Sequence, residues 1–437
     1  MGDTILTING GSSTIKFAAF SWSDAPQRIL TGQIDGIARA DTTLSVRTDM
    51  SKAETHRVAI RASDHGQAAH SLIDWIVGWA GNEKFQAIGH RIVHGGVRLD
   101  RHQVVTSDLL QELRRTQPLD LAHLPREIAL IEAFGQRLPG VIQVACFDTV
   151  FHRLLPRVAQ ILPIPRRYFD AGIRRLGFHG LSYAYLLEEL RRIAGAAADG
   201  RVILAHLGSG ASLTALHHGS PVDTSMAFTP TSGLTMGTRP GDLDPGLLVY
   251  LMRSEKWTPE QLDEFVSHSC GLAGVSNSTS DMRELIARRA HDESAREAFD
   301  LFCYQAKKWI GAYTAALGGL ETLVFSGGIG EHSPEARGGI CEGLQYLGIR
   351  LDRARNSKFT KTAGLISGSG SRVAVHVIPT DEEVMIARIV FDLVAGKPEP
   401  VTLDAGTRCA ELREALLERN SPAGVGSISQ TDRAAVR

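Results

Sequence analysis

Three glycine-rich segments of the sequence have the composition of anion-binding loops. They span residues 10–13, 207–210 and 327–330, and each follows a predicted strand. Glycine lets backbone N–H groups approach an anion without a Cβ atom in the way, and serine hydroxyls add donors. Lys16, just beyond the first segment, adds an ammonium group. A single segment of this kind is a tight turn more often than a binding site, but three at strand ends favour phosphate binding.

Common phosphate-binding motifs are absent from the sequence. There is no G-x-x-x-x-G-K-[ST] segment, and no strand-linked G-x-G-x-x-G with a later acidic partner. The paired H-R-D and D-F-G motifs of protein kinases are also missing. The remaining interpretation is a nucleotide held between the glycine hairpins of two related lobes.

Four reactive side chains lie among glycines or directly after predicted strands: Arg91, Asp148, His179 and Arg239. Phosphoryl transfer needs cationic and hydrogen-bonding groups around the migrating phosphoryl group, and carboxylate or amide oxygens that reach a metal ion. It needs no Cys or Ser nucleophile, because positioning and charge stabilisation supply most of the catalysis. This combination therefore predicts a phosphoryl-transfer site.

Each polar segment also has a structural interpretation. An isolated arginine lies on the surface more often than in a site, and His94 and His123 suit hydrogen-bonded structural roles. Thr380 or Asp381 as the N-cap of a final helix with an acidic first turn would explain the last polar segment by itself.

The glycine hairpins indicate an internal duplication. Residues 5–9 and 14–20 are β-rich and flank the first glycine turn, and residues 202–206 and 211–216 flank the second. Two similar hairpins can arise by chance, but this spacing is what a duplicated two-domain fold would show.

The rest of the chain alternates between helical and strand patterns, which predicts an α/β fold in two lobes. We expect strands over residues 87–93, 141–147, 322–326 and 373–378, and helices over residues 67–79, 125–136, 246–252, 283–289, 295–317 and 382–394. The predicted N-terminal lobe covers residues 1–150 and is completed by the helix at about 382–395. The C-terminal lobe covers residues 151–381, and residues 397–437 form a largely disordered tail with one amphipathic stretch at 409–419.

Composition restricts the partners and the compartment. Lys+Arg 47 against Asp+Glu 48 gives a net charge of -1, so neither nucleic acid nor a membrane surface is an expected partner. No apolar run approaches the roughly 20 residues that span a bilayer. The five cysteines are irregularly spaced without a C-x-x-C pair, which argues against disulfides or a zinc site and for a reducing cytoplasmic location.

Eight segments in one order make the chain resemble the acetate kinase family. They include NGGSSTIK at residues 9–16, GHRIVHGG at 89–96, FDTVFH at 147–152 and RLGFHG at 175–180. The others are HLGSGAS at 206–212, DTSMAFTP at 223–230, MGTRPGDLDP at 236–245 and FSGGIGE at 325–331. The resemblance extends from about residue 4 to residue 394.

This resemblance implies a duplicated, actin-like two-lobed fold, a homodimer, and reversible transfer of a phosphoryl group from ATP to acetate with Mg²⁺ or Mn²⁺. It assigns the metal to Asn9 and Glu382, and the substrate carboxylate to Arg91. Asp148 would orient or deprotonate that carboxylate, while His179 and Arg239 would stabilise the transferring group.

By the same resemblance, the acyl pocket is lined by Val93, Ala122, Phe178 and Pro230. Nucleotide binding is assigned to Ser12, Thr14, Lys16, His206, Leu207, Gly208, Ser209, Gly210, Asp281, Met282, Arg283, Gly327, Gly328, Ile329, Gly330 and Glu331.

The sequence departs from the family pattern near both substrates. Ser209 replaces the usual Asn of the second phosphate loop, and Thr14 replaces a Ser in the first. Ala122 stands where a leucine normally closes the acyl pocket, and Leu124 stands where Asn is usual. A kinase that prefers propionate or butyrate is therefore an alternative, as is a non-catalytic nucleotide switch of the same fold.

Overall fold

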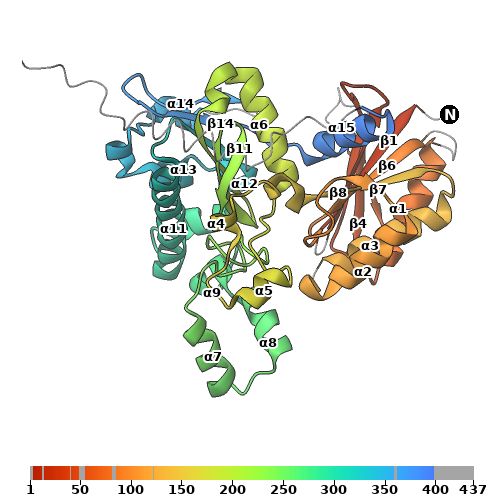
Figure 1. Cartoon of the computed structure of the whole chain (residues 1–437), viewed down its shortest axis with the longest axis horizontal. Coiled ribbons are helices and arrows are strands. Elements are labelled where there is room, and N and C mark those ends of the chain that lie inside the picture. Colours follow the sequence, from red (N-terminus) through yellow and green to blue (C-terminus); the bar gives the residue numbers. More distant parts are fainter. Residues whose placement is uncertain are drawn as a thin grey trace, which may run out of the picture. The chain divides into compact units, whose positions relative to one another are not determined.

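Two mixed β-sheets with helices on both faces make up the described part of the chain in the computed structural model (Figure 1). The structure describes residues 3–11, 14–39, 41–48, 55–80, 85–121, 123–358 and 362–397. Ser12, Ala122, and the predicted tail beyond Lys397 with its amphipathic stretch lie outside these residues.

The first sheet has eight strands. In spatial order they are β5 (His56–Ala59), β4 (Thr43–Arg47), β3 (Arg28–Asp35), β2 (Thr14–Ser21), β1 (Thr4–Gly10), β6 (Phe85–Ile92), β8 (Ile142–Phe147) and β7 (Gln103–Val104). β1 and β2 form the predicted hairpin, and β6 and β8 continue the sheet parallel to β1.

The second sheet repeats the plan of the first. Its order is β11 (Ser220–Thr224), β10 (Ala211–His217), β9 (Arg201–Leu207), β12 (Thr322–Ser326), β14 (Ala374–Val377) and β13 (Gly364–Leu365). Here too a hairpin is followed by two parallel strands, and the short edge strand is antiparallel to its neighbour. The predicted internal duplication is confirmed, because six strands of each sheet share order and direction.

The helices connect and cover these sheets. They are α1 (His65–Ala80), α2 (Ser107–Thr116), α3 (Leu124–Arg137), α4 (Arg157–Gln160), α5 (Arg166–Asp170), α6 (Gly180–Ala194), α7 (Pro245–Ser254), α8 (Pro259–Glu264), α9 (Gly271–Ser276), α10 (Met282–Arg288), α11 (Glu293–Leu317), α12 (Gly327–His332), α13 (Pro334–Cys341), α14 (Arg353–Ser357) and α15 (Glu382–Val394). A 3-10 turn, Asp148–His152, follows β8.

Alternation along the strands gives the first sheet two apolar faces. On one face, Leu6 and Ile8 of β1 pack with residues of α1 and α3. On the other face, Ile5 packs with Ile386 and Val390 of α15. The last helix of the compact unit thus packs on the first sheet.

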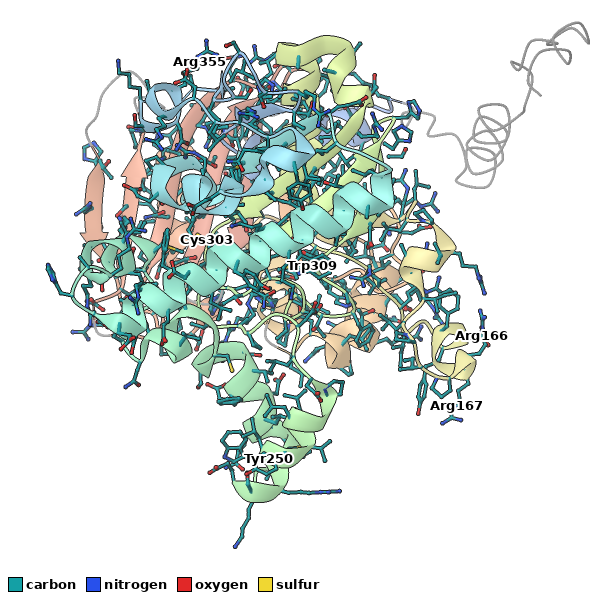
Figure 2. The ribbon with its side chains drawn as sticks, turned by 90° about the vertical axis from the view of Figure 1, so that its left-hand side faces the viewer. Arg166, Arg167, Tyr250, Cys303, Trp309 and Arg355 are labelled. Atoms are coloured by element: carbon teal, nitrogen blue, oxygen red, sulfur yellow. The ribbon has the colours of Figure 1, made fainter. Side chains whose placement is uncertain are left out.

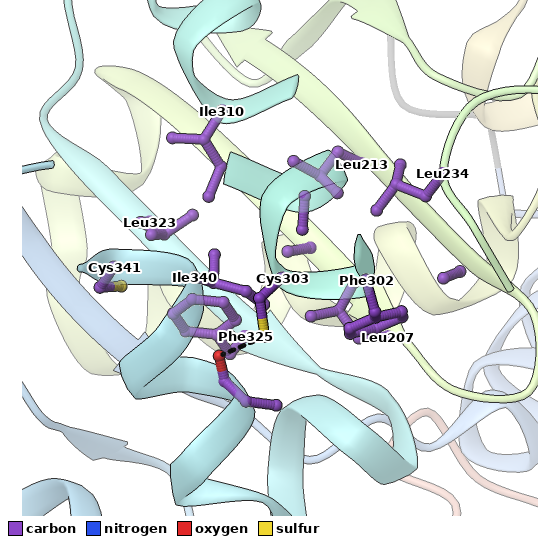
Figure 3. Close-up of a cluster of buried hydrophobic side chains, with 14 of the residues drawn as sticks. Leu207, Leu213, Leu234, Phe302, Cys303, Ile310, Leu323, Phe325, Ile340 and Cys341 are labelled. Carbon is purple, nitrogen blue, oxygen red and sulfur yellow. Dashed lines mark hydrogen bonds between the residues drawn. The ribbon is translucent and has the colours of Figure 1, made fainter. Parts of the chain in front are cut away.

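The largest core lies in the second half of the chain, where α11 runs past the second sheet (Figure 2). Leu207, Leu213 and Phe325 of that sheet pack against Phe302 of α11 and Ile340 of α13 (Figure 3). This packing supports the ends of β9 and β12. The second glycine loop follows β9, whereas the third segment, which the sequence predicts to be a loop, forms the first turn of α12; we keep the name third glycine loop for it.

Every strand and core helix that the sequence predicts is present within a few residues of its expected ends. The other elements, among them β3, β4, β5, α2 and α6, had no predicted counterpart. Residues 1–399 group as one compact unit, so the division into lobes at residues 150 and 381 stays a prediction. Within the described residues, no helix is long and apolar enough to cross a membrane.

Candidate active site

The residues predicted for the N-terminal half of the site share one face of the first sheet. In β1, Ile5 and Asn9 are four residues apart, so Asn9 lies on the face that α15 covers. In β6, Gly89 packs directly on α15, and Arg91, two residues later, points the same way. Asp148 follows β8, which lies beside β6 in the sheet.

Arg91 lies at the centre of a buried network that joins three parts of the chain. Its Nη2 atom donates to Asp148 Oδ2 at 2.6 Å, and its Nη1 atom donates to Asn9 Oδ1 at 3.3 Å. Its Nε atom lies 3.8 Å from Glu382 Oε2. Glu382 Oε2 in turn accepts from Asn9 Nδ2 at 2.9 Å, and Oε1 accepts from Ser182 Oγ at 2.5 Å.

Burial and neighbouring charges shift the pKa values of the ionisable groups in this network. Burial disfavours a charged Arg91, but Asp148 and Glu382 raise its pKa above the ordinary arginine value. Burial would raise the pKa of Glu382, but Arg91, His206 and two hydrogen bonds lower it to about 2. For Asp148 burial dominates, and its pKa is raised despite Arg91.

The C-terminal half of the site has a matching arrangement. His179 is the N-cap of α6 in a left-handed backbone conformation (φ 58°), and its Nδ1 atom lies 2.8 Å from Ser212 Oγ. Ser212 Oγ is also 2.5 Å from the hydroxyl of Tyr183, one turn along α6. Ser212 pairs with His206 in the β9–β10 hairpin, and the His179 and His206 rings are 4.5 Å apart. Asn9 and Lys16 occupy the corresponding pair in the first hairpin.

The surroundings of His179 favour the neutral imidazole. Burial lowers its pKa well below the ordinary value, and His206, Arg91 and Arg239 lower it further. When the Ser212 hydroxyl donates to Nδ1, the proton of His179 lies on Nε2, where it can be donated to an anion. In that arrangement Ser212 positions the His179 ring with Nε2 as its donor nitrogen.

Arg239 is the second cation of the site. Its Nη1 atom donates to the Pro230 carbonyl at 2.6 Å, and burial lowers its pKa to about 10, so it is charged at neutral pH. No carboxylate in the described residues forms an ion pair with it. A Cβ atom built on Gly210 would lie 2.8 Å from Arg239 Nη2 and 3.2 Å from His179 Nε2. The second glycine loop, His179 and Arg239 therefore meet at one point.

The second and third glycine loops are also in contact. Gly327 has a positive φ of 74°, and a Cβ atom there would lie 2.7 Å from the Leu207 carbonyl oxygen. The Gly237 amide donates to the Ser209 carbonyl at 2.9 Å, and Ser280, next to Asp281, approaches Gly237. The predicted phosphate and adenosine segments thus lie together.

The acyl-pocket residues are partly assembled. Val93 and Phe178 are buried in one apolar cluster, and Pro230 is held against Arg239. Both carboxylate oxygens of Glu127, on α3, accept from the Val93 amide at 3.1–3.2 Å. Burial raises the pKa of Glu127 well above the ordinary value.

Sequence reasoning missed Glu127, Ser182, Ser212 and Tyr183. Ser212 ends the HLGSGAS segment, but the contact that gives it a role joins it to His179, 33 positions away in the chain. The structure shows a local hydrogen bond for His94, for which the sequence suggested a structural role. Its Nδ1 atom accepts from the Gly96 amide.

Other predicted residues lie outside this centre. Lys16 lines an open cavity of about 800 Å³ over β2–β5, together with Glu383. Arg283 is exposed and pairs with Asp281, which caps α10. Ser12 and Ala122 are outside the described residues.

The family model of the acetokinase family matches residues 4–388. The chain belongs to this family. An acetate kinase of Rhodopseudomonas palustris is 41% identical over 401 residues, which cover 91% of this chain and 100% of the relative. A propionate kinase of Citrobacter rodentium is 39% identical over 414 residues, covering 93% and 100%.

Solved structures of the acetokinase family have the same fold. The Porphyromonas gingivalis acetate kinase gives a TM-score of 0.80 at 32% identity, covering 90% of this chain and 99% of that one. A Francisella tularensis propionate kinase gives 0.82 at 32% identity, covering 89% and 99%. The predicted α/β, duplicated two-lobed actin-like fold is thereby confirmed.

We expect Ser212→Ala to lower kcat by about tenfold, because His179 loses the partner that determines its donor nitrogen. The KM values for nucleotide and acyl substrate should change by less than about twofold. Steady-state kinetics and the ¹⁵N shifts of the His179 ring measure both effects. Ser254→Ala, on α7, serves as control. Unchanged ring shifts in Ser212→Ala would remove this role of Ser212.

Proposed function

We propose that this chain catalyses reversible phosphoryl transfer from ATP to acetate, giving acetyl phosphate and ADP. Membership of the acetokinase family supports an acyl kinase, and the geometry around Arg91 supports the carboxylate acceptor. The Arg91 Nε atom is buried and lacks a hydrogen-bond partner among the described residues. A planar guanidinium that Asp148 and Asn9 hold in one orientation suits recognition of a small carboxylate.

The acceptor needs orientation rather than deprotonation. A short-chain carboxylic acid is already ionised at neutral pH, since carboxyl groups have pKa values near 4. Asp148 is hydrogen-bonded to Arg91, so its position fixes the guanidinium that receives the substrate. We therefore assign Asp148 the orienting role of the two that the resemblance allows.

In the proposed reaction, a carboxylate oxygen attacks the γ-phosphorus of ATP in line with the leaving oxygen of ADP. The bond to that leaving oxygen breaks as the new P–O bond forms. Arg239 and the Nε2–H of His179, which meet beside Gly210, stabilise the charge on the transferring group. The glycine loops and Lys16 hold the remaining phosphates.

Asn9 and Glu382 would hold a divalent cation, Mg²⁺ or Mn²⁺. Their donors are an amide oxygen and a charged carboxylate, which suit a hard cation that also binds phosphate and water. Within the described ranges no group of three or more His, Cys, Asp or Glu is arranged to hold a metal, so protein ligands are few. When bound, the cation would neutralise charge on the phosphates.

A propionate-preferring kinase is the second candidate. It is favoured because propionate kinases are among the similar proteins. In addition, the family resemblance puts Ala122 where a leucine normally closes the pocket. One or two fewer methylenes in a pocket wall change the discrimination between acetate and propionate by roughly 1–3 kcal/mol.

The chain should form acyl hydroxamate when incubated with ATP, Mg²⁺, hydroxylamine and a C2–C4 acid. We expect acetate and propionate to give kcat/KM values within about tenfold of one another, because Ala122, which the resemblance assigns to the acyl pocket, is smaller than the leucine usual there. Formation of hydroxamate is read by its colour with ferric iron.

Ala122→Leu is the matched variant for chain length. It should raise the acetate-to-propionate ratio of kcat/KM by about tenfold. ATP binding without hydroxamate from any acid would instead identify a nucleotide switch and end the kinase proposal.

Arg91→Ala should raise the KM for the carboxylate by far more than the KM for ATP, because the proposal assigns the carboxylate, and no atom of ATP, to that guanidinium. Loss of a charged hydrogen bond corresponds to roughly tenfold or more. Initial rates with each substrate varied separately give both values. A larger effect on the KM for ATP would refute the assignment. Arg98→Ala, which removes an exposed arginine, is the control.

We also propose a cytoplasmic homodimer with no nucleic-acid partner. The four cysteines in the described residues are free thiols, consistent with a reducing compartment. α7 buries none of its residues, and Leu247, Val249 and Tyr250 are 41%, 47% and 65% exposed. Figure 2 shows Tyr250 at the end of the molecule that α7 and α8 form. Such an apolar helix suits contact with a second copy.

Tyr250→Glu combined with Leu247→Asp should convert the dimer to a monomer, because it introduces charge into the proposed interface. Sedimentation velocity at micromolar concentration measures the mass. Val158→Asp, which changes an 83%-exposed residue of α4, should leave the dimer intact. A wild-type chain that sediments as a monomer would contradict the proposal.

A further inference from the structure

Glu331 lies where the third glycine loop meets the linker into α15. The carboxylate is 12% exposed. Its Oε1 atom accepts from the Gly327 amide at 2.9 Å, from the Thr380 amide at 3.1 Å, and from Ser326 Oγ at 3.4 Å. One oxygen atom therefore holds the start of the loop and a linker residue that is 49 positions away in the chain.

The linker held by Glu331 leads directly to the proposed metal-binding carboxylate. Glu382 is two residues beyond Thr380 and is the first residue of α15. The intervening Asp381 caps α15 by accepting from the Val384 amide, and it pairs with Arg28 of β3 at 2.5 Å. The linker is thus held from the second sheet by Glu331 and from the first sheet by Arg28.

The other end of the connection touches the phosphate loops. Gly327 packs on the Leu207 carbonyl so closely that no side chain fits there. A phosphate bound by the amides of these loops would restrict the position of Gly327. Because Glu331 accepts from both the Gly327 and the Thr380 amides, it would also restrict Thr380. Hydrogen bonds to a charged acceptor in a partly buried site are among the stronger ones.

We propose that Glu331 is a positioning residue that couples the occupancy of the nucleotide loop to the placement of Glu382. Nucleotide binding would then increase the affinity for the divalent cation, and the cation would increase nucleotide affinity by the same factor, as linkage requires. This inference rests on the proposed function. It differs from the role implied by the family resemblance, in which Glu331 is one of the residues that bind the nucleotide directly.

The main test compares Glu331→Ala with Glu331→Gln. Alanine removes the acceptor, so the Mg²⁺ concentration for half-maximal ADP binding should rise by about tenfold, while ADP affinity without Mg²⁺ changes by less than about threefold. Glutamine retains a carbonyl oxygen for both amides and should restore most of the coupling. Titration of a fluorescent ADP analogue with and without Mg²⁺ gives these constants without an activity assay.

Glu335→Gln is the control, because Glu335 is an exposed acid on the next helix. A nucleoside-contact role predicts that Glu331→Ala weakens ADP equally with and without Mg²⁺. A purely structural role predicts a lower melting temperature with unchanged coupling. Either result overturns the proposal.

Hydrogen exchange on the wild-type chain gives a test that needs no variant. ADP alone should slow exchange at residues 379–384 as well as in the glycine loops, because the Thr380 amide is bonded to Glu331. Protection limited to the loops would overturn the coupling. This measurement is independent of whether the acyl acceptor has been identified correctly, since failure of the kinase proposal would show as absent hydroxamate instead.

Discussion

Arg91 is a largely buried guanidinium that two carboxylates accompany, and much of the site depends on this pairing. Removal of one partner from a buried ion pair is strongly destabilising, because the remaining charge is left without compensation. Arg91 is hydrogen-bonded to the ends of β1 and β8 and lies near the start of α15. The Asn9–Glu382 bond within this network joins residues 373 positions apart. Satisfying one charge therefore brings the two ends of the compact unit together.

The duplicated fold supplies a reason for the location of this network. Each sheet is covered by a helix whose N-terminal end reaches the glycine hairpin: α15 on the first sheet and α6 on the second. The two helices also pack on each other, and Arg388 pairs with Glu188 at 2.6 Å across them. The chain crosses between the sheets once before α6 and once before α15, so both crossings deliver polar residues to the site.

The two halves of the site differ in the charge states of their residues. Glu382 stays charged because Arg91 and its hydrogen bonds outweigh burial. His179 stays neutral because nearby cations and burial act in the same direction. Arg239 keeps its charge without an ion-pair partner in the described residues, so its positive charge can attract an incoming anion. A neutral donor beside an uncompensated cation suits a phosphoryl group whose charge is spread over several oxygens.

The amino-acid sequence by itself determined the local elements, the repeat of the hairpins and the family. These depend on interactions within short segments: strand alternation, glycine turns and ordered motifs such as HLGSGAS. It also named Asn9, Arg91, Asp148, His179 and Arg239, which the fold brings into one buried site or its immediate surroundings.

Only the tertiary structure decided the partners of those residues. Ser212 beside His179, Ser182 beside Glu382, and Glu331 beneath Thr380 are contacts between segments far apart in the chain. A single sequence records neither the distance nor the burial on which such contacts depend. Burial also selected the charge states, because the same histidine or carboxyl group titrates differently in water and in an interior next to an arginine.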